Sequence, residues 1–151
     1  MLKNIDMRNR HILELSLAVM YLAEGSKTVD DLCVANAEPL VLKFFLEGLR
    51  RVYDIECDRL RCELHLRADQ NPVSAKRYWS RQLHLPLSNF TYVSVDKRTV
   101  GSKTYPHYKG VCALKYGNVA IQRRLVFLAR FFCEQVSHGD GRVAQLVRAS
   151  R

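Results

Sequence analysis

Apolar side chains recur with a period near 3.6 in four segments of the chain, and this period predicts four helices. The segments span residues 11–23, 39–53, 72–83 and 119–135. In the first, one apolar row contains Ile12 and Val19 and a second contains Leu13 and Leu17, so we expect this helix to be buried on two sides. Pro39 and Pro72 suit the first turns of the second and third helices.

Strict alternation of apolar and polar residues marks the clearest strand, over residues 59–67. Leu60, Cys62, Leu64 and Leu66 form the predicted core face, and the opposite face carries Arg59, Arg61, Glu63, His65 and Arg67. Three more strands are predicted at 29–35, 91–97 and 110–116, with a polar loop over 98–109 between the last two.

The resulting order is α-β-α-β-α-β-β-α, which predicts an α+β fold with helices packed on one face of a mixed four-stranded sheet. Residues 1–136 form one domain in this interpretation. Residues 137–151 begin with Ser-His-Gly-Asp-Gly and lack a core pattern, so we expect a disordered tail.

Composition limits the class of protein. A chain of 151 residues that is 48% hydrophobic is expected to form a globular domain with a real core. Its apolar runs are short and interrupted by charge, so no membrane segment is expected, and the N-terminus lacks a secretory signal pattern. The five cysteines are scattered without Cys-x-x-Cys spacing, which favours reduced thiols in a cytoplasmic protein over a disulfide framework or zinc site.

The formal net charge is +9, which favours a polyanionic partner such as nucleic acid. Between Tyr92 and Arg130 there are eight Lys or Arg residues with Asp96 as the single acid, and tyrosines lie among them. Lys and Arg contact phosphates, while Tyr can stack on bases. A solvated basic hairpin is the alternative. The candidate nucleic-acid-binding residues are Lys27, Arg59, Arg61, His65, Arg67, Lys97, Arg98, Lys103, Tyr105, His107, Lys109 and Lys115.

The first predicted helix ends in Glu24, which Gly25 follows. A carboxylate at the negative end of a helix dipole costs roughly 0.3–1 kcal/mol unless a cation lies nearby. Mg²⁺ or Ca²⁺ would remove this cost, because both prefer oxygen ligands. The alternative is an exposed Glu beside a glycine that stops the helix in the left-handed conformation.

Residues 17–25, Leu-Ala-Val-Met-Tyr-Leu-Ala-Glu-Gly, resemble the nine-residue signature of the LAGLIDADG family of homing endonucleases and their regulator relatives. Leu17, Ala18, Ala23 and Gly25 are identical to that signature, and Glu24 replaces its final Asp. Four further segments are similar to a bacterial branch of the family, and the resemblance covers roughly residues 10–135. These segments are Leu64-His65-Leu66, Ala75 to Ser80, Leu85 to Phe90 and Tyr116 to Ala120.

The resemblance implies a saddle-shaped sheet over the major groove of double-stranded DNA. It also implies Mg²⁺ held at Glu24 and Gly25, with Glu24 as the catalytic acid of a site-specific endonuclease. Because the chain has one motif, it implies a homodimer paired through the helix that ends at Glu24, on a near-palindromic site. Lys97 and Lys109 lie outside the family motifs and are our candidates for a basic residue that steadies the phosphate.

Three of the departures from the signature bear on cleavage. Val19 stands at a signature glycine, Leu22 at a signature Asp, and Glu24 is one methylene longer than Asp. These departures leave open a non-catalytic DNA-binding transcriptional regulator and an RNA-binding splicing helper on the same fold. Relatives often carry an N-terminal helix-turn-helix, and this chain begins too close to the motif to include one.

Overall fold

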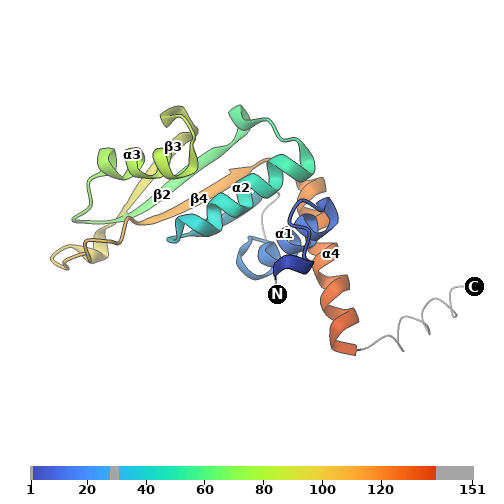
Figure 1. The fold of residues 1–151 in the computed structure, drawn as a ribbon. Coiled ribbons are helices and arrows are strands. Elements are labelled where there is room, and N and C mark those ends of the chain that lie inside the picture. The colour runs from blue at the N-terminus through green and yellow to red at the C-terminus, as the bar shows by residue number, and fades with distance from the viewer. Residues whose placement is uncertain (1, 28–30, 139–151) are drawn as a thin grey trace, which may run out of the picture.

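The computed structural model describes residues 2–27 and 31–138, and its elements follow the predicted order (Figure 1). The helices are α1 (Arg10–Glu24), α2 (Pro39–Tyr53), α3 (Pro72–Leu83) and α4 (Val119–His138). The strands are β1 (Leu32–Asn36), β2 (Arg61–Arg67), β3 (Phe90–Asp96) and β4 (Val111–Tyr116). Four 3₁₀ turns are η1 (Leu2–Asn4), η2 (Cys57–Arg59), η3 (Leu87–Asn89) and η4 (Lys97–Thr99).

Several element boundaries differ from the predicted ones by one to three residues, and two of the differences concern predicted site or domain residues. The strand β2 starts at Arg61, and Arg59 belongs to the turn η2 instead of the strand. The helix α4 continues through Ser137 and His138, two residues past the predicted end of the domain. The rest of the predicted tail, and the start of the first predicted strand at residue 29, lie outside the described residues.

The four strands form one mixed sheet in the order β1-β4-β2-β3. The pairs β1–β4 and β4–β2 are antiparallel, and β2–β3 is parallel. The parallel pair follows from the connection between these strands, because α3 carries the chain back to the start of the sheet before β3 begins. The prediction of an α+β fold with a mixed four-stranded sheet is confirmed.

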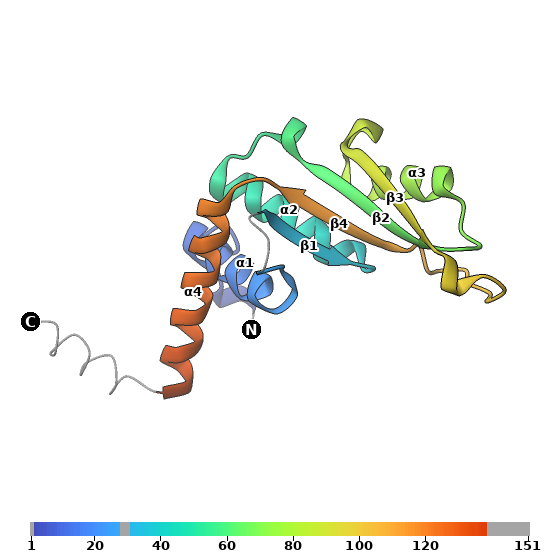
Figure 2. The same cartoon turned by 180° about the vertical axis from the view of Figure 1, so that it is seen from behind.

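The helices α2 and α3 cover one face of this sheet, and the hydrophobic core lies beneath them (Figure 1). The alternation in β2 is confirmed, since Leu60, Cys62, Leu64 and Leu66 are at most 2% exposed. Figure 2 shows the opposite face without a helix in front of it. We call this the outer face; from β2 it carries Arg61, Glu63, His65 and Arg67. A folded sheet that leaves one face uncovered in this way presents a broad binding surface.

Helix α1 packs between α2 and α4 beside β1. Leu17, Ala18 and Tyr21 are fully buried, whereas Ile12 is 40% exposed and Ser16 is exposed. In the other row Ile12 faces outward, whereas Val19 and Leu22 are half-buried and pack against the core, so the expectation of burial on two sides is confirmed in part. Within the part of the chain that the structure describes, no helix has the length and apolar character needed to cross a membrane.

Side-chain caps explain where the helices begin. The Oδ1 atom of Asn9 accepts hydrogen bonds from the backbone N–H groups of His11 and Ile12, and Asn71 does the same for Val73 and Ser74. An Asn at this position satisfies N–H groups that have no partner within the helix. The predicted start of α3 at Asn71-Pro72 is confirmed.

Candidate nucleic-acid interface

The outer face runs along β2 from Arg61 to Arg67, which is about 20 Å for a strand of this length. On one side Arg61 pairs with Lys115 of β4, and on the other His65 and Arg67 pair with Ser94 and Asp96 of β3. The Nδ1 atom of His65 and the hydroxyl of Ser94 form a hydrogen bond of 2.7 Å. The register therefore places four of the predicted nucleic-acid-binding residues, Arg61, His65, Arg67 and Lys115, on one surface.

Several cations on this side of the molecule already have an acidic partner. Arg61 contacts Asp31 at 2.7 Å and Lys115 contacts Glu63 at 2.9 Å. Arg98 donates two hydrogen bonds to Asp96, and these lower the pKa of that carboxyl group. Such solvent-accessible ion pairs contribute little to stability, so a phosphate could replace the acid at small cost. The positive potential of the outer face is still weaker than the count of Lys and Arg suggests.

The polar loop between β3 and β4 is a well-anchored segment. We call residues 97–110 the strap; they include η4, Lys97–Thr99. Thr104 donates its backbone N–H and its hydroxyl to the Asp69 carboxylate, and Arg67 Nε donates to the Thr104 hydroxyl at 2.9 Å. Further along, Trp79 Nε1 donates to the carbonyl of Lys109 at 3.0 Å. These contacts hold the strap in place at Thr104 and at the backbone of Lys109.

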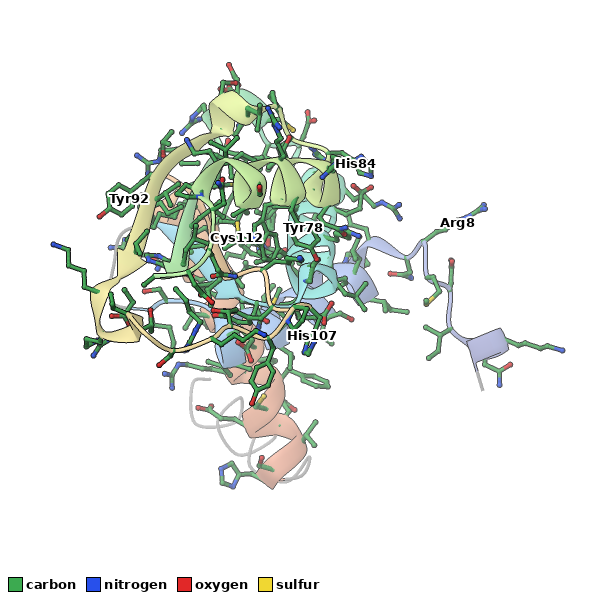
Figure 3. All side chains as sticks on the ribbon, turned by 90° about the vertical axis from the view of Figure 1, so that its left-hand side faces the viewer. Arg8, Tyr78, His84, Tyr92, His107 and Cys112 are labelled. Atoms are coloured by element: carbon green, nitrogen blue, oxygen red, sulfur yellow. The ribbon has the colours of Figure 1, made fainter. Side chains whose placement is uncertain are left out.

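The strap divides its predicted binding residues between two sides of the molecule. Lys103 and Tyr105 line a hollow with His65 and Arg67 at the end of the outer face. His107 and Lys109 instead line a hollow on the helical side, with Tyr78 of α3 and the start of α2. In Figure 3, Tyr92 points away from the helices, whereas His107 lies near Tyr78. Tyr105 also lines a hollow with Lys109 along α3, and its ring stacks on His107, so the two groups of strap residues meet at Tyr105.

Two further predicted residues lie away from the outer face. Arg59 donates to the carbonyl of Gly117 at 3.0 Å and lies over the Tyr116 ring, at the opposite end of β2 from the strap. The Lys27 ammonium donates to the carbonyls of Leu22 and Gly25, at 2.8 and 3.1 Å. Both residues are engaged in local structure at the ends of elements.

Glu24 occupies the exposed end of α1, as predicted. Its carboxylate accepts one hydrogen bond of 3.3 Å from the side-chain amide of Asn36, at the end of β1. Gly25 is extended, with φ −80° and ψ 152°, so the predicted left-handed stop is wrong. The chain continues from α1 into a bridge with Val34 at the edge of β1. Glycine is required there because the ring and carbonyl of Tyr21 occupy the space of a Cβ atom.

The donor set at this helix end fits a metal ion only in part. The Glu24 carboxylate is accessible, but the Gly25 carbonyl already accepts from Lys27, so an ion bound there would displace the ammonium. Among the described residues, no group of three His, Cys, Asp or Glu side chains lies close enough to hold a metal. Mg²⁺ at this place would need ligands from outside the single chain.

The two candidate basic catalytic residues differ in their relation to Glu24. Lys109 lines the same hollow of about 630 Å³ as Asn36, the hydrogen-bond partner of Glu24. Lys97 starts the turn η4, directly after Asp96 on the outer face. Lys109 thus shares a hollow with Asn36, and its ammonium lies 5.9 Å from the centroid of the Tyr78 ring, whereas Lys97 does not line that hollow.

The sequence did not single out the residues that anchor the strap, which include Asp69, Gln70 and Thr104. Gln70 Nε2 donates to the carbonyl of Tyr108 at 2.8 Å, 38 residues along the chain. No spacing rule relates positions so far apart, although the polar run Asp69-Gln70-Asn71 after a clear strand is a signal that this turn forms hydrogen bonds with another segment.

Comparison with models of known protein families, with curated proteins and with solved structures finds no match.

Proposed function

We propose that this chain binds duplex DNA on the outer face of its sheet, in the manner that the resemblance to the LAGLIDADG family implies. The observation that carries the proposal is the uncovered sheet face, which ends at Arg67 and at the strap cations Lys97 and Lys103. Neither lysine forms an ion pair within the described residues, so both remain available to phosphates.

The outward row of α1 supports a homodimer. Ile12, Ser16, Val19 and Ala23 follow one side of the helix without a charged residue, and all four are exposed or half-buried. A soluble chain seldom leaves such a row to water, and small residues such as Ser16 and Ala23 permit close approach of a second helix. In this proposal the α1 helices of two chains pack together, and the two Glu24 carboxylates come near one another.

A paired arrangement would also supply the second carboxylate that one chain lacks. Two like charges at two helix ends are unfavourable without a cation between them. Mg²⁺ bound there would activate water and stabilise the leaving oxygen of a phosphodiester. The proposed role within the chain is Glu24 as the metal-binding acid. Of the two candidate cations, Lys97 follows Asp96 on the side of the sheet where DNA would dock, whereas Lys109 lines a hollow on the helical side.

A second candidate is a regulator that binds DNA without cutting it. The observation that favours it is Lys27, whose ammonium occupies the carbonyls at the end of α1 and removes the need for a metal there. Val19, at a signature glycine, also widens the outward row of α1.

The test is incubation of a randomised duplex-DNA library with Mg²⁺ and either wild type or Glu24→Gln. Glu134→Gln, which changes an exposed Glu on α4, is the matched control. We expect site-specific cuts from wild type and Glu134→Gln and none from Glu24→Gln, which should still bind DNA. Binding without cuts by wild type would establish the regulator. Cuts by Glu24→Gln would contradict the metal-binding role, and stronger binding to structured RNA than to duplex DNA at the same salt would establish the splicing helper.

A further inference from the structure

The strap encloses a hollow at the end of the outer face, which we call the strap pocket. Its volume is about 540 Å³, which lies within the range of small-molecule sites in proteins. Arg67, Lys103 and His65 contribute positive or donor groups to its wall, and Tyr105, Tyr108 and Val111 contribute rings and apolar surface.

The walls of this pocket are fixed by hydrogen bonds. Arg67 and Asp69 both hold Thr104, and Gln70 holds the backbone of Tyr108. Gly110 closes the strap with a φ of +80°, where a Cβ atom would lie 2.5 Å from Leu66. A pocket held open in this way loses little conformational freedom when a ligand enters.

Its chemistry combines a cationic side with an aromatic one. The Nε–H group of Arg67 donates a hydrogen bond to the Thr104 hydroxyl, and the terminal nitrogens of Arg67 make no hydrogen bond within the described residues. Asp96 also lines the pocket, but its carboxylate accepts both hydrogen bonds from Arg98. Tyr105 is 75% exposed and its ring stacks on His107 with 6.1 Å between centroids. Arg and Lys bind phosphate, and an exposed Tyr ring is a surface on which a nucleobase stacks.

We propose that the strap pocket binds a single nucleotide, with its base on Tyr105 and its phosphate at Arg67 and Lys103. A paired base is stacked between its neighbours and cannot reach such a pocket, so the nucleotide in a bound duplex would be an unpaired one. An unpaired nucleotide of a bound duplex is one source of the ligand, and this source rests on the proposed function. A free mononucleotide presents the same chemistry and is the other source.

The experiment compares three ligands by fluorescence anisotropy and competition. They are a labelled paired duplex, the same duplex with one additional unpaired adenosine, and free dAMP as competitor. We expect the bulged duplex to bind roughly tenfold more tightly than the paired one, the effect of one base stacked on an aromatic ring. Tyr105→Ala should abolish this preference, so that the two duplexes bind with the same affinity. Tyr92→Ala is the control, because Tyr92 is 55% exposed on the same face and does not line the pocket.

The outcomes separate this inference from the proposed function. Equal binding of both duplexes by wild type, without binding of dAMP, would overturn the nucleotide pocket and leave DNA binding in place. Binding of neither duplex would contradict the proposed function; saturable dAMP binding that Tyr105→Ala removes would then support the pocket with a free nucleotide as its ligand. Absence of binding to all three ligands would overturn both.

Discussion

Lys27 neutralises the partial negative charge at the C-terminal end of α1 within a single chain. Its ammonium group donates to the carbonyls of Leu22 and Gly25, where the helix dipole is negative. The exposed Glu24 beside it therefore does not by itself demand a metal ion. In the proposed dimer, the Glu24 carboxylate of the second chain would supply the charge that favours Mg²⁺, so the proposed metal binding depends on dimer formation.

Gly110 gives a sharp residue-scale prediction, because Gly101 is a matched control. Both have positive φ, +80° and +83°, but a Cβ atom at Gly101 would meet nothing within 4 Å. Gly101→Ala should lower the free energy of unfolding by about 1 kcal/mol through its backbone conformation alone. Gly110→Ala should lower it by about 2–4 kcal/mol, because it adds a clash with Leu66 and the His65 carbonyl.

Urea denaturation of the two variants measures this difference. Equal losses of stability would show that the strap end moves freely, against the account of a fixed strap.

At the scale of elements, one buried carboxylate joins three helices. Glu14 of α1 is 6% exposed and accepts from Tyr53 of α2 at 2.8 Å and from Arg124 of α4 at 2.5 Å. The Arg124 guanidinium lowers the pKa of Glu14, and burial opposes it to a smaller extent. In return, burial and the nearby Glu14 carboxylate raise the pKa of Tyr53.

The pH dependence of stability follows from the direction of the Glu14 pKa shift. A carboxyl group whose pKa is lower in the folded state stabilises the fold above its unfolded pKa of 4.5, and this contribution is lost as pH falls through the folded value. At pH 7, Glu14→Gln should lower the free energy of unfolding by about 1–3 kcal/mol. The gap between wild type and variant should shrink as the pH is lowered below about 4.5. Denaturation curves at several pH values would contradict this account if the gap stayed constant.

The outward row of α1 leads to a prediction about assembly. Ser16→Lys places a charge in the middle of this row, whereas Ala120→Lys places one at an exposed position on α4. We expect Ser16→Lys to halve the molar mass found by sedimentation equilibrium and Ala120→Lys to leave it at that of a dimer. Both variants should fold, because both positions are exposed. A wild-type protein that sedimented as a monomer would contradict dimer formation through α1.

The elements could be predicted from sequence because their signals are local. The bounds of α2 and α3 match the prediction, and the core face of β2 does too, since each depends on periodicity and on a cap a few residues away. The sheet order, the Arg61–Asp31 pair and the Asp69–Thr104 anchor connect residues 28 or more positions apart. A pattern along the chain carries no information on such contacts. The count of cations therefore overstated the charge of the outer face and missed the division of the strap.

At the scale of the whole molecule, the net charge is +9, and cations of the described residues lie on both sides of the sheet. On the helical side, Lys43 and Lys76 lie on α2 and α3; on the other side, Lys97 and Lys103 lie on the strap beside the outer face. If DNA were bound by general electrostatic attraction, both pairs of lysines would contribute to affinity. If DNA docks on the outer face, only the strap pair would contribute. The proposed function therefore depends on where the lysines lie more than on the net charge of the chain.

The measurement that tests this claim most directly is the salt dependence of duplex-DNA binding by two double variants of equal charge. Lys97→Ala/Lys103→Ala should weaken binding about tenfold or more and reduce the slope of log K against log[salt] by about 2. Lys43→Ala/Lys76→Ala should retain nearly the wild-type affinity and slope. Equal losses in the two variants would mean that DNA does not dock on the outer face, and would contradict the central claim.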